Sequence, residues 1–259
     1  MDTGLRTNAS GSRVNFASEW AFIGASALLF LASVGGTIYY SMGSIPGMSM
    51  PGQTWLGSAA SFMGTWIVMM VAMMLPSLVP ELLRYRAFAR GEAGPHLAPL
   101  TVLAGAGYFF VWAGFGLAAY LLGLLWSAAS MQWMDLTSYV PAATGFILLL
   151  AGIFQLSAWK AHQLDCCREN PVSGQLPTPD GRAAWTYGLR LGWHCVLCCL
   201  GFMVILLITG MMNLASMAII AAAITVERLA PRPQLIARAA GVIMIAAGVL
   251  VFARILGVV

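Results

Sequence analysis

The apolar residues of this chain fall into long blocks, unlike the alternation of a half-buried strand or the stripe of a soluble amphipathic helix. Blocks of about 20 apolar residues match the length that a helix needs to cross a hydrocarbon core of roughly 30 Å. The pattern therefore predicts an all-α, polytopic transmembrane helical bundle. It forms one domain over residues 1–259, with about seven helices near 19–40, 59–82, 97–126, 139–159, 191–209, 214–229 and 235–256.

Two parts of this prediction concern loops. Only four residues separate the fifth and sixth segments, and both segments are short, so a tight or re-entrant hairpin is an alternative to two full spans. The longest connection, residues 160–190, contains Pro171, Gly174, Pro177, Pro179 and Gly181 and is predicted to be a flexible cytoplasmic loop.

The composition agrees with a membrane protein and excludes most soluble classes. Hydrophobic residues make up 60% of the chain and charged residues 8%, whereas a soluble domain carries roughly 25% charged residues. The net charge of +4 comes from single or paired basic residues beside apolar segments, so nucleic acid is not expected as a partner. No motif for hydrolysis, phosphoryl transfer or dinucleotide binding is present, which favours a protein that is not an enzyme.

The basic residues also predict the orientation. They gather in the amino-terminal tail and in the second, fourth and sixth loops, while the first, third and fifth loops contain no Lys or Arg. Because cytoplasmic loops carry the excess of Lys and Arg, the amino terminus is predicted to be cytoplasmic and the carboxyl terminus external. The expected location is the inner (cytoplasmic) membrane, with the bilayer itself as the first partner.

The five cysteines form two groups, each with a histidine nearby. One group lies at the end of the fourth segment and the other at the start of the fifth, and the predicted topology places both on the cytoplasmic side. Residues three or four apart share a helix face, so Cys195 can face Cys198 and Cys199. The candidate metal ligands are Cys195, Cys198, Cys199, Cys167, Cys166, His194 and His162.

Thiolates and imidazoles bind Zn(II), Cu(I) or iron–sulfur clusters, and a four-coordinate set such as His162, Cys166, Cys195 and Cys199 is one arrangement. Copper or zinc is the expected ion. Three other interpretations stay open. The cysteines can be small packing residues, they can hold a structural zinc ion, or Cys195 and Cys198 can act in thiol–disulfide exchange. A reducing cytoplasm disfavours structural disulfides.

A methionine stripe marks the second segment. Thioethers one turn apart can coordinate Cu(I), so the stripe is a candidate ion pathway toward the cysteines, although methionine is also a common packing residue. Met42, Met48, Met50, Met131, Met134, Met211 and Met212 lie at the predicted outer face. The candidate pathway consists of Met63, Met69, Met70, Met73 and Met74.

Two further features concern packing. Glu81 and Glu227 end the second and sixth segments, and both are expected to pair with nearby arginines rather than relay protons. Small residues allow helices in a membrane to approach closely, within the chain or against a partner. They recur in the third segment as Gly105, Gly107, Gly114, Gly116 and Gly123.

Three stretches together resemble a bacterial family of uncharacterised proteins described as predicted metal-binding integral membrane proteins. They are TWIVMMVAMMLPS, AGIFQLSAWKAHQLDCCRENP, and GWHCVLCCLGFM continuing through GMMNLASMAIIAAAITVERLAP. The resemblance covers most of the chain from the second segment onward. It implies a multi-helix membrane fold and a metal site at Cys167, Cys195, Cys198 and Cys199. The family pattern differs here in having a cysteine at the position of Gln163 and a glycine at that of Leu197, which makes Cys166 an addition.

These observations lead to one main functional hypothesis. The chain is expected to handle a soft metal, copper before zinc, in transport or in delivery to a partner protein that donates or accepts the metal. The alternatives are an accessory subunit of a larger membrane complex, such as a metal-dependent oxidoreductase, and a membrane thiol oxidoreductase.

Overall fold

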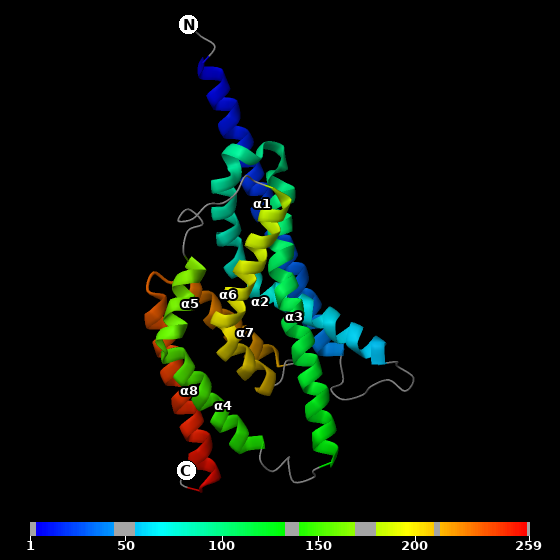
Figure 1. Ribbon diagram of the computed structural model, residues 1–259, viewed down its shortest axis with the longest axis vertical. Helices are drawn as coiled ribbons and strands as arrows, with labels where there is room; N and C mark the ends of the chain where they lie inside the picture. Colours follow the sequence, from blue (N-terminus) through cyan, green and yellow to red (C-terminus); the bar gives the residue numbers. More distant parts are fainter. Residues whose placement is uncertain (1–3, 44–54, 133–139, 169–179, 210–212, 258–259) are drawn as a thin grey trace.

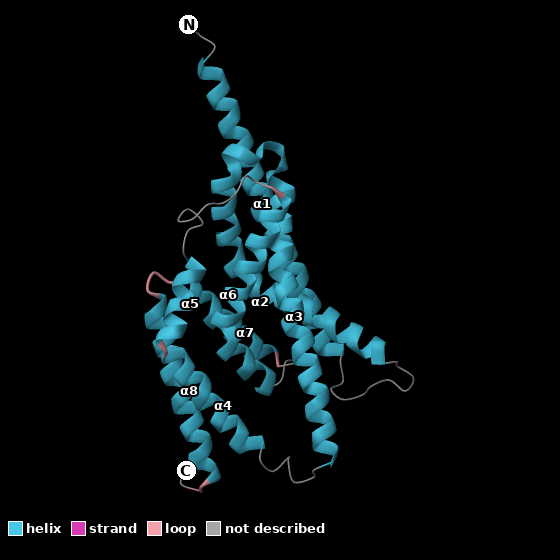
Figure 2. Ribbon diagram, viewed as in Figure 1, coloured by secondary structure: helices cyan, strands magenta, loops and turns pink. Residues whose placement is uncertain are grey.

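The protein is an assembly of α-helices in the part of the chain that the computed structural model describes, residues 4–43, 55–132, 140–168, 180–209 and 213–257 (Figure 2). These ranges contain no strand. In order, the helices are α1 (Gly4–Gly43), α2 (Trp55–Ala93), the 3₁₀ turn η1 (Gly94–His96), α3 (Leu97–Gln132), α4 (Val140–Leu156), α5 (Ala158–Arg168), α6 (Gly181–Thr209), α7 (Leu214–Leu229) and α8 (Pro233–Ile255).

Five helices are long and apolar enough to cross a bilayer, and they identify a membrane protein. Their apolar stretches are Ala17–Met42, Leu56–Arg90, Leu97–Ala129, Gly181–Ile208 and Pro233–Ile255. Two further elements are less regular. Helices α4 and α5 meet at a bend of 60° and together have the composition of one broken span, while α7 has 16 residues and is shorter than a full span.

The arrangement corrects the predicted loop at 160–190. Helix α5 occupies its first part, and α6 begins at Gly181, ten residues before the predicted start at residue 191. Between them, residues 169–179, with most of the prolines and glycines of the predicted connector, lie outside the described residues. The early start of α6 matters because it moves the cysteines of this helix from its first turns to its middle.

Helix pairs with small residues at their contacts set the architecture. Helix α3 packs along α6, and α4 packs along α8 (Figure 1). At Gly188 of α6, an added Cβ would lie 2.1 Å from the carbonyl oxygen of Ala104 on α3. The corresponding distance at Gly152 of α4 is 2.8 Å from the carbonyl oxygen of Gly241 on α8. These backbones are therefore closer than any residue with a Cβ permits.

The glycines of α3 divide into two groups. An added Cβ at Gly107 would lie 2.7 Å from the carbonyl oxygen of Trp185, and at Gly116 it would lie 2.4 Å from the ring of Trp66. Nothing lies within 4 Å of such an atom at Gly114 or Gly123. The glycine-rich segment is thus used for packing within the chain at some positions and not at others.

Ionic contacts hold α1 against α2 near the ends that carry the basic residues. The guanidinium groups of Arg86 and Arg90 lie 3.2 Å and 2.7 Å from the same carboxylate oxygen of Glu19. Arg86 also donates to the side chain of Ser18 at 2.8 Å and is buried. Helix α2 itself continues through Pro76 and Pro80 without ending.

Candidate metal centre

Two thiols lie side by side in the middle of α6. Cys195 and Cys199 are one helical turn apart, and their Sγ atoms are 3.9 Å from each other. Their residues are 0% and 2% exposed, so both sulfurs are removed from water. The spacing in the sequence predicted this pairing, but the depth of the pair in the helix follows only from the early start of α6.

The third cysteine of α6 packs against two further helices, although its side chain also interacts with that of Cys199. Cys198 is buried in a small cluster with Leu164 of α5 and Ala237 of α8. Its carbonyl oxygen accepts a hydrogen bond from the ammonium group of Lys160. The prediction grouped the three cysteines as one set. In the structure Cys195 and Cys199 pack in one cluster of buried residues and Cys198 in another, while the side chains of Cys198 and Cys199 interact.

Cys195 has polar partners from two other helices. The hydroxyl of Tyr108 on α3 lies 2.9 Å from its Sγ atom, and Nη1 of Arg228 on α7 donates to the same sulfur at 3.2 Å. The same guanidinium nitrogen also donates to the hydroxyl of Ser77 on α2 at 3.1 Å. Side chains of α3 and α7 therefore contact this sulfur of α6, and Arg228 links it to Ser77 of α2.

Several thioethers belong to the same buried cluster as the thiol pair. Ser77 lies one turn beyond Met73 and Met74 on α2, so the face of α2 that reaches Arg228 is the methionine face. The shared core cluster contains both thiols together with Met69, Met70, Met73, Met74 and Met203, all at most 4% exposed. Met63, the first residue of the predicted pathway, is only partly buried.

A buried ion pair lies on the other side of α7. The Lys160 ammonium of α5 is 2.6 Å from the Glu227 carboxylate, and the Gln155 side chain of α4 donates to the same carboxylate at 3.0 Å. Glu227 is 2% exposed and Lys160 1% exposed. The prediction that Glu227 pairs with an arginine is wrong, because its partner is a lysine 67 positions earlier in the chain. Glu81 does pair with an arginine, Arg84, at 3.1 Å.

The remaining predicted ligands lie away from the thiol pair or outside the described side chains. His162 is exposed on α5, and Nδ1 of His194 lies 2.9 Å from the side-chain oxygen of Gln163. The side chains of Cys166 and Cys167, in the last turn of α5, are not among those described. Among the side chains that are, no three from His, Cys, Asp and Glu are grouped so that they could hold a metal ion.

The predicted outer methionines also lie largely outside the described part. Met42 is 80% exposed near the end of α1. The side chains of Met48, Met50, Met131, Met134, Met211 and Met212 are not described.

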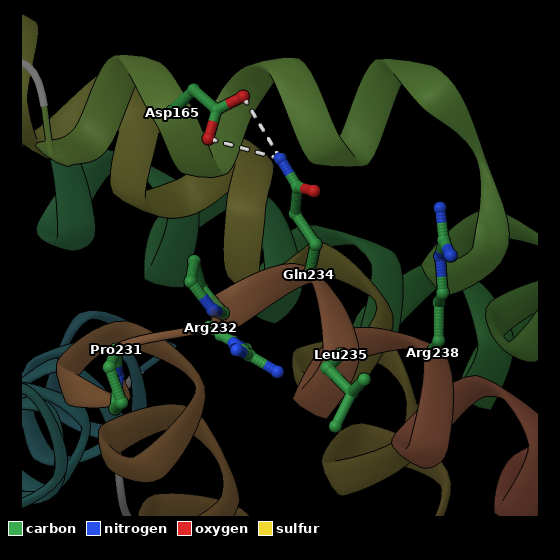
Figure 3. Close-up of a pocket in the computed structure, with 7 residues that line it drawn as sticks. Asp165, Pro231, Arg232, Gln234, Leu235 and Arg238 are labelled. Atoms are coloured by element: carbon green, nitrogen blue, oxygen red, sulfur yellow. Dashed lines mark hydrogen bonds between the residues drawn. The ribbon is translucent and has the colours of Figure 1, made fainter.

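A pocket of about 600 Å³ opens where α5 meets the turn between α7 and α8. Figure 3 shows Asp165 of α5 accepting from the side chain of Gln234, which lies at the start of α8, while Arg232 and Arg238 carry positive charge at the rim. The pocket lies near the end of α5 that carries Cys166 and Cys167.

The spacing of the two thiols is compatible with both binding one soft metal ion. Two sulfurs about 2.3 Å from one ion subtend an angle of about 115° when they are 3.9 Å apart, which leaves room for a third ligand. Neighbouring thioethers are neutral, soft ligands that suit Cu(I). The donor set of thiols and methionines therefore fits copper better than it fits hard divalent ions.

The sequence of this chain matches the profile of the PpoB2 copper chaperone family over residues 63–251. The chain belongs to this family. The match begins at the first methionine of the predicted pathway and includes the thiol pair, Arg228 and the buried ion pair. No curated protein and no solved structure is detectably similar to the chain. The family places the protein among those that handle copper, as the cysteine and methionine patterns predicted.

Sequence reasoning missed three residues around Cys195. Tyr108 lies in an apolar segment and gives no signal on its own. Arg228 was interpreted as a basic residue of the sixth loop, although an ionisable group at the end of a membrane segment is a candidate functional residue. Ser77 follows the methionine stripe, and the sequence gives no sign that its hydroxyl accepts a hydrogen bond from Arg228.

Proposed function

We propose that this copper chaperone binds one Cu(I) ion between Cys195 and Cys199 and delivers it to a partner protein at the membrane. The observation that carries this proposal is the thiol pair, 3.9 Å apart and buried in a core cluster that includes methionines of α2 and α6. Buried thiolates and thioethers hold a soft monovalent ion strongly while excluding water.

The methionine face of α2 gives the ion a route to the thiols. Met70, Met73 and Met74 are at most 2% exposed and belong to the same buried cluster as the thiols. Thioethers bind Cu(I) through one neutral sulfur each, so an ion can pass from one to the next more readily than it could leave a thiolate pair. In the predicted orientation this route leads from the outer half of the bundle toward the cytoplasmic half.

The decisive experiment measures bound copper on the purified full-length protein, loaded with Cu(I) under anaerobic conditions. The Cys195→Ser/Cys199→Ser variant is expected to lose the bound ion, because serine hydroxyls are hard, weak ligands for Cu(I). Cys198→Ser shows how much of the loss comes from changing any buried thiol of α6, since Cys198 is equally buried and packs with Leu164 and Ala237. Equal copper content in wild type and the double variant overturns the proposal.

Delivery and transport differ in where the copper goes. When sealed vesicles containing the protein are supplied with Cu(I), a chaperone is expected to hold about one ion per chain, and the lumen should stay free of copper. Accumulation of many ions per chain inside the vesicles would identify a transporter instead.

A further inference from the structure

We propose that Arg228 is a fixed counter-cation that makes the Cys195–Cys199 pair select a monovalent ion over a divalent one. This inference rests on the copper-binding function proposed above and adds a determinant of specificity. The observation behind it is the hydrogen bond of 3.2 Å from Nη1 of Arg228 to Sγ of Cys195.

The position of Arg228 is fixed by its contacts. The same nitrogen donates to the Ser77 hydroxyl at 3.1 Å, which ties the guanidinium to α2 as well as to α6. The residue is 7% exposed, so its charge acts in surroundings of low dielectric constant. An arginine keeps its charge in a protein at any ordinary pH, so the positive charge beside the thiols is permanent.

The nearest ion pair on α7 does not alter this charge. Glu227 is next to Arg228 in the sequence, but its carboxylate is 2.6 Å from the ammonium of Lys160. That pair sums to zero and lies on the side of α7 toward α4 and α5. Arg228 instead points toward Ser77 and Cys195, on the side of α2 and α6.

The sum of charges then depends on the ion. Two thiolates carry −2, Cu(I) contributes +1 and Arg228 contributes +1, which leaves a neutral buried site. With a divalent ion, the same groups sum to +1. Thioethers and the Tyr108 hydroxyl are neutral and do not change either sum. A net charge inside a membrane bundle is costly, so the neutral combination is favoured.

Softness of the ligands alone makes a different prediction. Thiolates and thioethers bind the soft divalent ion Cd(II) as well as the soft monovalent ions Cu(I) and Ag(I). A site governed by softness accepts all three, whereas a site governed by charge balance accepts Ag(I) and rejects Cd(II). Ag(I) is also the softer of the two ions, so the effect of charge is read from the change in their affinity ratio when the charge of Arg228 is removed.

The experiment titrates the full-length protein in detergent with Ag(I) or Cd(II) alone, in competition with a chelator. Wild type is expected to prefer Ag(I). Arg228→Gln, which keeps a hydrogen-bond donor and removes the charge, is expected to shift the ratio of the two affinities toward Cd(II) by at least about tenfold. Arg228→Lys retains the charge and is expected to retain most of the preference.

Arg86→Gln is the matched control, because Arg86 is also buried on a helix but contacts Glu19 and Ser18. It should leave the ratio unchanged. A wild-type protein that binds Cd(II) as tightly as Ag(I) overturns the inference. This measurement needs no variant, so it holds even if Arg228→Gln does not fold. An Arg228→Gln protein with an unchanged ratio overturns it too. Failure of wild type to bind Cu(I) or Ag(I) at Cys195 and Cys199 would instead contradict the function proposed above.

Discussion

The ammonium group of Lys160 and the carboxylate of Glu227 lie 2.6 Å apart in the interior of the bundle, joining α5 to α7 across 67 positions of sequence. The same ammonium donates to the carbonyl oxygen of Cys198, so α6 is held as well. One buried charge thus fixes three helices around the bend between α4 and α5. Its role is architectural, and it holds the middle of α6 where the thiol pair lies.

Removing one partner of this pair is expected to cost far more than removing both. Lys160→Met leaves the Glu227 carboxylate buried without its cation and should lower the free energy of unfolding by about 3–5 kcal/mol. The double variant Lys160→Met/Glu227→Leu removes both charges and is expected to be much closer to wild type. Thermal unfolding of the three proteins in detergent measures this. A double variant less stable than Lys160→Met would contradict the conclusion that Lys160 and Glu227 form a buried ion pair.

Methionines on the inner face of α2 are expected to matter for copper more than for stability. Met73→Leu/Met74→Leu nearly conserves volume and should cost less than about 1.5 kcal/mol per site. Copper affinity is expected to fall by at least about tenfold, because leucine provides no ligand. Met244→Leu is the control and should leave the affinity unchanged, because Met244 is buried on α8, a helix that packs against α4 and α7. Competition with a Cu(I) chelator measures the copper affinity of wild type, the double variant and the control. Equal affinities in the three proteins would mean that the methionine stripe serves packing alone.

The contact between α3 and α6 makes a separate prediction about glycine. Gly188→Ala places a methyl group 2.1 Å from the carbonyl oxygen of Ala104 and should destabilise the bundle by about 1–3 kcal/mol. Gly114→Ala has open space around it and is expected to be neutral or slightly stabilising, because alanine favours the helix by about 1 kcal/mol. Unfolding measurements should rank the two variants in this order, and the reverse order would contradict the described packing.

The predicted orientation can be tested on α8 alone. Arg238, near its beginning, is exposed, and Leu256, just beyond its end, is 75% exposed. In a Cys166→Ser/Cys167→Ser background, a cysteine at position 256 is expected to react with a membrane-impermeant maleimide in intact cells, because the carboxyl terminus is predicted to be external. A cysteine at position 238 should react only after the cells are opened. The opposite pattern would invert the topology and favour thiol exchange by Cys195 and Cys198 over copper binding.

The sequence by itself determined the features that depend on local pattern. Long apolar blocks predicted membrane helices because spanning a bilayer demands a minimum length of apolar chain. The interval of four residues between Cys195 and Cys199 predicted that their side chains share a face, because helix geometry is fixed by the backbone. The combination of thiols and methionines predicted copper because ligand softness belongs to the side chains themselves.

Only the tertiary structure decided which groups meet across helices. It packed Cys198 against Leu164 and Ala237, paired Glu227 with Lys160, and placed Arg228 beside Cys195. The apolar pattern could not foresee these contacts, because helices in lipid are apolar on every side and their rotation is set by glycine contacts and buried polar groups far apart in sequence. The types of ligand at the proposed copper site could therefore be predicted from the sequence, while the polar and charged groups beside Cys195 are brought there by the packing of α2, α3, α6 and α7.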